Sequence, residues 1–253
     1  MTAARVAVRH VDCSFELGDR DAGRRAYLEG HIPGASFLSL DAHLSDLSVE
    51  GAGRHPLPSA QAFARAAGEA GIGEGVLAVA YDRAGEGGAA RLWWLLRHFG
   101  HDDAAVLRGG LQSWLGPLRG GEEDVEPAVF VPRPRTDDTI EADELLARLG
   151  EPGLVVVDAR APERYRGEVE PYDPVAGHIP GAVNWPHAQA GPDVPPRILE
   201  AQEIVVYCGS GVSATVDLLA LARAGRPDAR LYPGSWSDWS TRGLPAEQGG
   251  GGR

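Results

Sequence analysis

Short runs of apolar, often β-branched residues alternate with amphipathic stretches along the chain. Residues 154–157 (Leu-Val-Val-Val) and 204–207 (Ile-Val-Val-Tyr) are almost continuously apolar, which is typical of strands buried on both faces of a parallel sheet. Apolar residues recur at helical spacing over 213–224, and Gly225 suits the end of that helix. A matching helix is expected at roughly 89–99, before Gly100. The alternation predicts an α/β fold with parallel sheets flanked by helices on both faces.

The hexapeptide Gly-His-Ile-Pro-Gly-Ala occurs twice, at 30–35 and at 177–182. Three other features recur in the same order: an aspartate ending an apolar run, a tyrosine ending the next run, and a later tryptophan. These pairs are Asp12 with Asp158, Tyr81 with Tyr207, and Trp114 with Trp239. Because a repeated hexapeptide with ordered flanking matches is improbable by chance, we expect a duplicated unit, and hence two tandem domains of one fold.

The repeat also suggests where the domains end. We expect a first domain at 1–117 and a second at 139–248. Between them, 118–138 is rich in Pro, Gly and acidic residues and is expected to be an extended linker, while the glycine-rich end, 249–253, is expected to be a flexible tail. The first copy carries extra residues between its hexapeptide and Tyr81.

Composition and charge exclude several classes of protein. With 43% hydrophobic and 24% charged residues the chain has an ordinary globular composition. A net charge of −12 without a long Lys/Arg block argues against nucleic acid or an anionic membrane as partner. No apolar run approaches a membrane span and the first residues lack the apolar core of a signal peptide, so we expect a cytoplasmic protein with no membrane association.

The chain has two cysteines, Cys13 and Cys208, too few for a disulfide framework or a four-thiolate zinc site. No Cys/His spacing indicates a metal and no lysine-containing phosphate loop is present, so we expect neither metal nor cofactor. Cys13 is expected to be a small buried residue. The histidines of the repeated hexapeptide are expected to be structural, because both copies have them and only the second copy has a cysteine at the end of its tyrosine-containing run.

Cys208 follows a predicted buried strand and precedes a helix, with Gly-Ser-Gly-Val-Ser between them. Open α/β sheets bind ligands at the carboxyl ends of their strands. The glycines allow successive N–H groups to turn inward at a helix N-terminus, which forms a site for an anion and favours a thiolate over a thiol. The sequence therefore predicts a reactive cysteine here. The same position in the first copy is Asp82, so that domain is expected to lack the nucleophile.

The chain resembles a two-domain rhodanese, a sulfurtransferase, over nearly its whole length. Three features carry the resemblance: the repeated hexapeptide, the aspartates at strand ends, and a cysteine loop in the second copy alone. The resemblance implies transfer of a sulfane sulfur from a small anionic donor, through a Cys208 persulfide, to a thiol, thioredoxin or cyanide. The loop residues implied to hold the donor and persulfide are Gly209, Gly211, Val212 and Ser213. Thiosulfate-type rhodaneses carry basic residues in this loop, so the neutral loop is more similar to that of 3-mercaptopyruvate sulfurtransferases.

The resemblance also implies roles for residues outside the loop. In the mercaptopyruvate branch a Ser–His–Asp group manages the proton of the donor thiol, and Ser210, His55 and Asp41 match it by context. Arg164, before an aromatic residue, matches an arginine that binds the donor, and Arg166 is a further candidate for its carboxylate. Some relatives have a second such arginine shortly before the hexapeptide; here that stretch is Glu-Pro-Tyr-Asp-Pro, 170–174.

A thiosulfate:cyanide sulfurtransferase is the nearest alternative, and a non-enzymatic rhodanese-like binding module comes next. A cysteine phosphatase requires an arginine at the end of the loop to hold the phosphate oxygens. This chain has Ala214 there, which argues against that chemistry.

Overall fold

The computed structural model describes residues 7–83 and 87–250. They fall into two compact units: the first comprises the chain up to Asp46 and Leu57–Arg135, and the second comprises Leu47–Pro56 and the chain from Thr136 onward. The repeat places residues 47–56 in the first copy, whereas their contacts group them with the second unit. The final residues of the expected flexible tail, 251–253, lie outside the described part of the chain.

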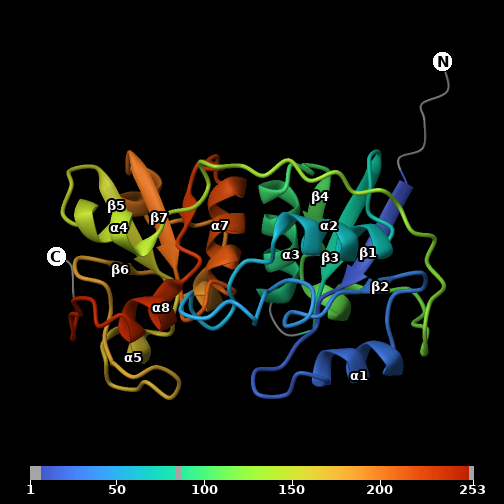
Figure 1. Ribbon diagram of the computed structural model, residues 1–253, viewed down its shortest axis with the longest axis horizontal. Helices are drawn as coiled ribbons and strands as arrows, with labels where there is room; N and C mark the ends of the chain where they lie inside the picture. Colours follow the sequence, from blue (N-terminus) through green and yellow to red (C-terminus); the bar gives the residue numbers. More distant parts are fainter. Residues whose placement is uncertain (1–6, 84–86, 251–253) are drawn as a thin grey trace. The chain divides into compact units, whose positions relative to one another are not determined.

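The first unit is built on a four-stranded parallel sheet (Figure 1). Its strands lie in the order β2 (Ser36–Phe37), β1 (Ala7–Asp12), β3 (Val76–Tyr81) and β4 (Ala104–Val106). Its helices are α1 (Ala22–Glu29), α2 (Ala60–Glu69), α3 (Gly87–His98) and the short 3₁₀ helix η1 (Gly110–Ser113). The stretch after η1 lacks helices and strands; backbone hydrogen bonds from Ala128 to Gly68 and from Arg133 to Phe99, both 2.8 Å, hold it to this unit.

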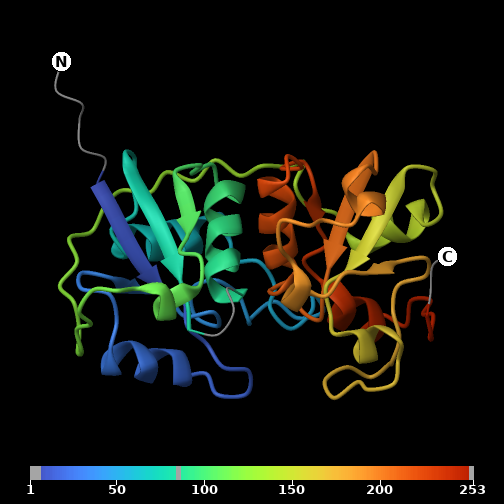
Figure 2. The same cartoon turned by 180° about the vertical axis from the view of Figure 1, so that it is seen from behind.

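The second unit repeats this topology (Figure 2). Its parallel strands lie in the order β6 (Val183–Asn184), β5 (Leu154–Asp158), β7 (Glu203–Tyr207) and β8 (Arg230–Leu231). Its helices are α4 (Ala142–Arg148), α5 (Pro162–Tyr165), η2 (His187–Gln189), α6 (Pro196–Leu199), α7 (Ala214–Arg223) and α8 (Ser235–Thr241). The predicted α/β class, with two parallel sheets and flanking helices, is confirmed.

The repeated hexapeptide forms the same turn in both units. His31 Nδ1 lies 2.8 Å from the carbonyl oxygen of Tyr27, and the two rings stack with centroids 4.0 Å apart. His178 Nδ1 lies 2.7 Å from the carbonyl oxygen of Tyr165, with ring centroids 3.8 Å apart. Both histidines are fully buried, so each fastens the turn to the helix before it, in agreement with the structural role predicted for them.

Candidate active site

Cys208 directly follows β7, an inner strand of the second sheet. Its backbone is fixed on both sides: its N–H donates to Ser235 Oγ at 3.1 Å, and its carbonyl oxygen accepts from the N–H of Trp236 at 3.0 Å. Trp236 is fully buried in the core of the unit. The cysteine is therefore anchored to the beginning of α8 as well as to the sheet.

Gly211 turns the loop back on the cysteine sulfur. Its φ of +77° is in the left-handed region, and its N–H donates to Cys208 Sγ at 3.1 Å. A Cβ atom at this position would lie 2.5 Å from the carbonyl oxygen of Pro233, so only glycine fits. An amide directed at a buried sulfur stabilises negative charge on it. This geometry provides the amide contact expected of the loop.

Ser210, two residues after the cysteine, is in contact with His55. His55 Nδ1 is 2.9 Å from Ser210 Oγ, and both side chains are buried. With Nδ1 unprotonated, the serine hydroxyl can donate its proton to it. Asp41, the third residue expected in this group, belongs to the first unit, where its carboxylate pairs with Arg20 at 3.3 Å.

The two candidate donor-binding arginines have different surroundings. Arg164 Nη2 donates to Glu170 Oε1 at 2.8 Å, and its Nη1 lies 3.1 Å from the point where a Cβ atom of Gly209 would be. Arg166 instead pairs with Glu168 at 2.7 Å in an exposed position. The structure thus places Arg164, with its positive charge, against the cysteine loop.

Sequence reasoning missed two residues next to this loop. Arg54, the residue before His55, has its guanidinium against Gly209. Ser235 holds the Cys208 amide and, with φ of +55°, is the one non-glycine residue with positive φ among those the structure describes. Strained backbone of this kind clusters at functional sites. Neither residue carried a signal beyond its position near a motif.

The first unit has a carboxylate where the second has its thiol. Asp82 Oδ2 accepts hydrogen bonds from the N–H groups of Gly88 at 3.0 Å and Ala89 at 3.1 Å, at the start of α3. The carbonyl oxygen of Asp82 accepts from the N–H of Leu111, as that of Cys208 does from Trp236. The aspartate therefore occupies the helix terminus with its own negative charge.

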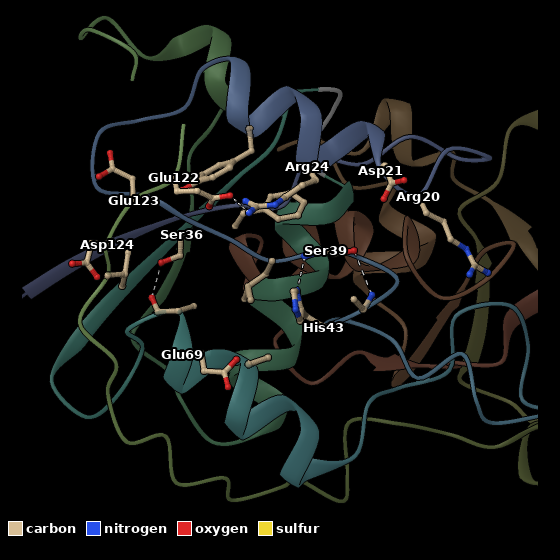
Figure 3. A pocket seen from close by; sticks show the side chains of 17 residues that line it. Arg20, Asp21, Arg24, Ser36, Ser39, His43, Glu69, Glu122, Glu123 and Asp124 are labelled. Atoms are coloured by element: carbon tan, nitrogen blue, oxygen red, sulfur yellow. Dashed lines mark hydrogen bonds and ion pairs between the residues drawn. The ribbon is translucent and has the colours of Figure 1, made fainter. Parts of the chain in front are cut away.

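A cavity of about 580 Å³ opens on the first unit (Figure 3). Among its lining residues, Arg24 pairs with Glu122, and the N–H of Ser39 donates to His43 Nδ1 at 2.9 Å. Its lining contains none of the predicted site residues. We therefore assign it no part in the chemistry at Cys208.

The described residues contain no group of three or more His, Cys, Asp or Glu side chains that could hold a metal ion. In the same part of the chain, no helix combines the length and apolar character needed to cross a membrane.

The duplicated fold and the cysteine loop agree with comparisons to known proteins. The family model for the rhodanese-like domain matches residues 5–116 and 141–242. The chain belongs to the rhodanese family, and the family predicted from the sequence is confirmed.

Named relatives match over nearly the whole chain. A probable 3-mercaptopyruvate sulfurtransferase of Pseudomonas aeruginosa is 43% identical, over 91% of this chain and 88% of that protein. A putative thiosulfate sulfurtransferase, SseB, of Mycobacterium tuberculosis is 41% identical, over 95% and 90%. The crystal structure of SseA from Escherichia coli, a 3-mercaptopyruvate enzyme, matches with a TM-score of 0.77 at 31% identity, over 91% and 93%. The prediction of a sulfurtransferase agrees with these names.

Proposed function

We propose that the protein is a sulfurtransferase that takes sulfur from 3-mercaptopyruvate onto Cys208 and passes it to a thiol, thioredoxin or cyanide. The observation that carries this proposal is the N–H of Gly211 donating to Cys208 Sγ at 3.1 Å in a buried loop without basic residues. The neutral loop favours mercaptopyruvate over thiosulfate, the substrate in the name of the M. tuberculosis relative.

In the first half-reaction the Cys208 thiolate attacks the sulfur of mercaptopyruvate. A sulfur–sulfur bond forms and the carbon–sulfur bond breaks, with its electron pair moving to the donor carbon to give the enolate of pyruvate. The proton of the donor thiol is transferred to that carbon, which completes pyruvate and leaves a Cys208 persulfide anion. Splitting the transfer in this way is nucleophilic catalysis, and the loop amides bind the resulting anion.

Ser210 and His55 are proposed to move that proton. The serine hydroxyl passes its proton to His55 Nδ1 as it takes one from the donor thiol, and the protonated pair then delivers a proton to the enolate carbon. The contact of 2.9 Å between Nδ1 and Oγ supports this route. Asp41 is proposed to orient the imidazole, and Arg164 to bind the donor carboxylate.

In the second half-reaction an acceptor attacks the outer sulfur of the persulfide. With cyanide the products are thiocyanate and the Cys208 thiolate; with a thiolate acceptor they are a new persulfide and the same thiolate. Atoms and charge balance in both cases without an added oxidant or reductant.

The test compares kcat/KM for 3-mercaptopyruvate and thiosulfate with cyanide as the common acceptor. We expect a preference for mercaptopyruvate of about tenfold or more, equal to about 1.4 kcal/mol of transition-state free energy. Wild-type protein incubated with the donor and no acceptor should gain the mass of one sulfur atom. We expect Cys208→Ser to abolish both this mass gain and sulfur transfer. A preference for thiosulfate would refute the donor assignment, and transfer that survives in Cys208→Ser would refute the mechanism. No transfer from either donor would favour a binding module.

A further inference from the structure

The proposed donor carries a carboxylate, and the stretch where some relatives have a second arginine for it is Glu-Pro-Tyr-Asp-Pro, 170–174, in this chain. The structure brings another arginine to the same place. Arg54, from the segment 47–56, has its Nη2 atom 2.9 Å from the point where a Cβ of Gly209 would lie, and Arg164 Nη1 lies 3.1 Å from that point. Two guanidinium groups therefore converge on the residue between the nucleophile and Ser210.

We infer that Arg54 is a donor-binding residue, which together with Arg164 forms the binding site for the carboxylate of the donor. This inference rests on the proposed function and extends it to a residue that the resemblance did not supply.

The backbone around Arg54 is held rigidly against the beginning of α8. The N–H of Arg54 donates to Ser237 Oγ at 3.0 Å, and Gly53, with φ of +85°, packs so closely that a Cβ there would lie 2.5 Å from the carbonyl oxygen of Gly234. Trp236, which fixes the Cys208 carbonyl, lies in the same short stretch of α8. The arginine and the nucleophile are thus anchored to one structural element, which suits precise placement of a ligand.

Two features keep the like-charged arginines together. Both guanidinium groups lie over the ring of Tyr172, at 5.6 Å for Arg54 and 5.2 Å for Arg164. Both also pair with the carboxylate of Asp173, which is almost fully buried, and Arg164 pairs with Glu170 as well. Tyr172, within the stretch where some relatives have an arginine, therefore helps to hold an arginine from another part of the chain.

The pair suits a carboxylate ligand. Asp173 already bridges the two arginines, which demonstrates that their spacing accepts a planar group with two oxygen atoms. The Arg54 side chain is 33% exposed and that of Arg164 is 17% exposed, so both keep surface that a small anion can contact. A donor held there by its carboxylate presents its sulfur to the adjacent cysteine.

The test uses Arg54→Gln, the charge-conserving Arg54→Lys, and Arg223→Gln as the matched control. Arg223 is an exposed arginine at the far end of α7 from the loop. The donors are 3-mercaptopyruvate and mercaptoacetone, which has the same thiol and ketone but no carboxylate. We expect Arg54→Gln to raise KM for mercaptopyruvate by about tenfold or more with kcat changed little. Arg54→Lys should fall between wild type and Arg54→Gln, because lysine keeps the charge but loses the planar fork. Mercaptoacetone kinetics and the Arg223→Gln control should be unchanged.

Equal losses with the two donors, or a KM unchanged by Arg54→Gln, would overturn the inference. Binding of mercaptopyruvate to Cys208→Ser protein, measured by calorimetry with and without Arg54→Gln, separates it from the proposed function. Weaker binding in the double variant supports the arginine site even if wild-type protein transfers no sulfur from this donor. Equal binding refutes the arginine site even if transfer is efficient.

Discussion

Asp217 is a buried acid directly behind the cysteine loop, and replacing it gives a sharp test of the electrostatics there. It lies in the first turn of α7 with its side chain fully buried, and neither carboxylate oxygen has a hydrogen-bond partner within the described residues. Burial raises the pKa of this carboxyl well above its usual range, and the nearby Cys208 and Asp158 raise it further. The folded protein therefore keeps a proton that the unfolded chain releases.

The substitution Asp217→Asn keeps the size of the side chain and removes its titration. Because the wild-type folded state holds one more proton than the unfolded state, its free energy of unfolding falls as pH rises above the usual range of a carboxyl, by up to about 1.4 kcal/mol per pH unit. The loss ends once the pH passes the raised pKa of the folded state. The Asn variant lacks this slope, so its stability advantage should grow by the same amount per unit and then become constant.

Hydrogen exchange at the buried α7 amides, corrected for the intrinsic rate, measures the difference in stability between Asp217→Asn and wild type at pH values of about 5, 6, 7 and 8. It reports on the second unit alone, which matters because two-unit proteins need not unfold in one step. Asp193→Asn, at an exposed aspartate of the same unit, is the control and should show no such trend. A difference in stability between Asp217→Asn and wild type that does not change with pH would refute a protonated Asp217.

Three further predictions concern the loop and its counterpart. Ser235→Ala should lower the free energy of unfolding by about 1–3 kcal/mol because it leaves the buried Cys208 amide unpaired. Ser235→Gly should lower it by about 1 kcal/mol less, because glycine relieves the strain of the positive φ. Urea unfolding compares the two variants, and equal losses would contradict the strain. Gly211→Ala should slow alkylation of Cys208 by iodoacetamide severalfold, because it moves the N–H of residue 211 away from the sulfur. Cys13, whose pKa is raised by burial, should stay unmodified. An unchanged rate at Cys208 would argue against the amide contact. Asp82→Ala should destabilise the first unit by about 1 kcal/mol through loss of a helix cap, as measured by hydrogen exchange at the α3 amides. Sulfur transfer should be unchanged, and reduced transfer would contradict a structural role for Asp82.

The main elements could be predicted because a strand buried on both faces is a continuous apolar run, and duplication supplied a second copy as a check. Thus β5 and β7 were located within a residue, and α7, expected at 213–224, is observed at Ala214–Arg223. The two-residue strands β2 and β6 were not predicted, since two residues show no periodicity.

The candidate site was predictable only where a local motif marked it. Cys208 and its loop combine strand, glycines and helix in a few consecutive residues, so local sequence was sufficient. His55 and Ser210 are 155 positions apart, and only the resemblance to a family connected them. Neither Arg54 nor Ser235 belongs to a sequence motif that indicates a chemical role. Their contacts with the cysteine loop arise from tertiary packing between distant segments. Such contacts cannot be recognised from the residues that are adjacent in the sequence.

The assignment of residues 47–56 to the second unit has a practical consequence for dissecting this protein genetically. A gene fragment that starts at Thr136 would encode the second sheet, the cysteine and α7, yet it would lack His55 and Arg54. Such a fragment would retain Cys208 while losing the proposed proton carrier and one of the two arginines beside the loop. The second unit, which carries the proposed catalytic residues, is therefore discontinuous in the gene. Any truncation, domain swap or fusion designed from the sequence repeat alone would divide it.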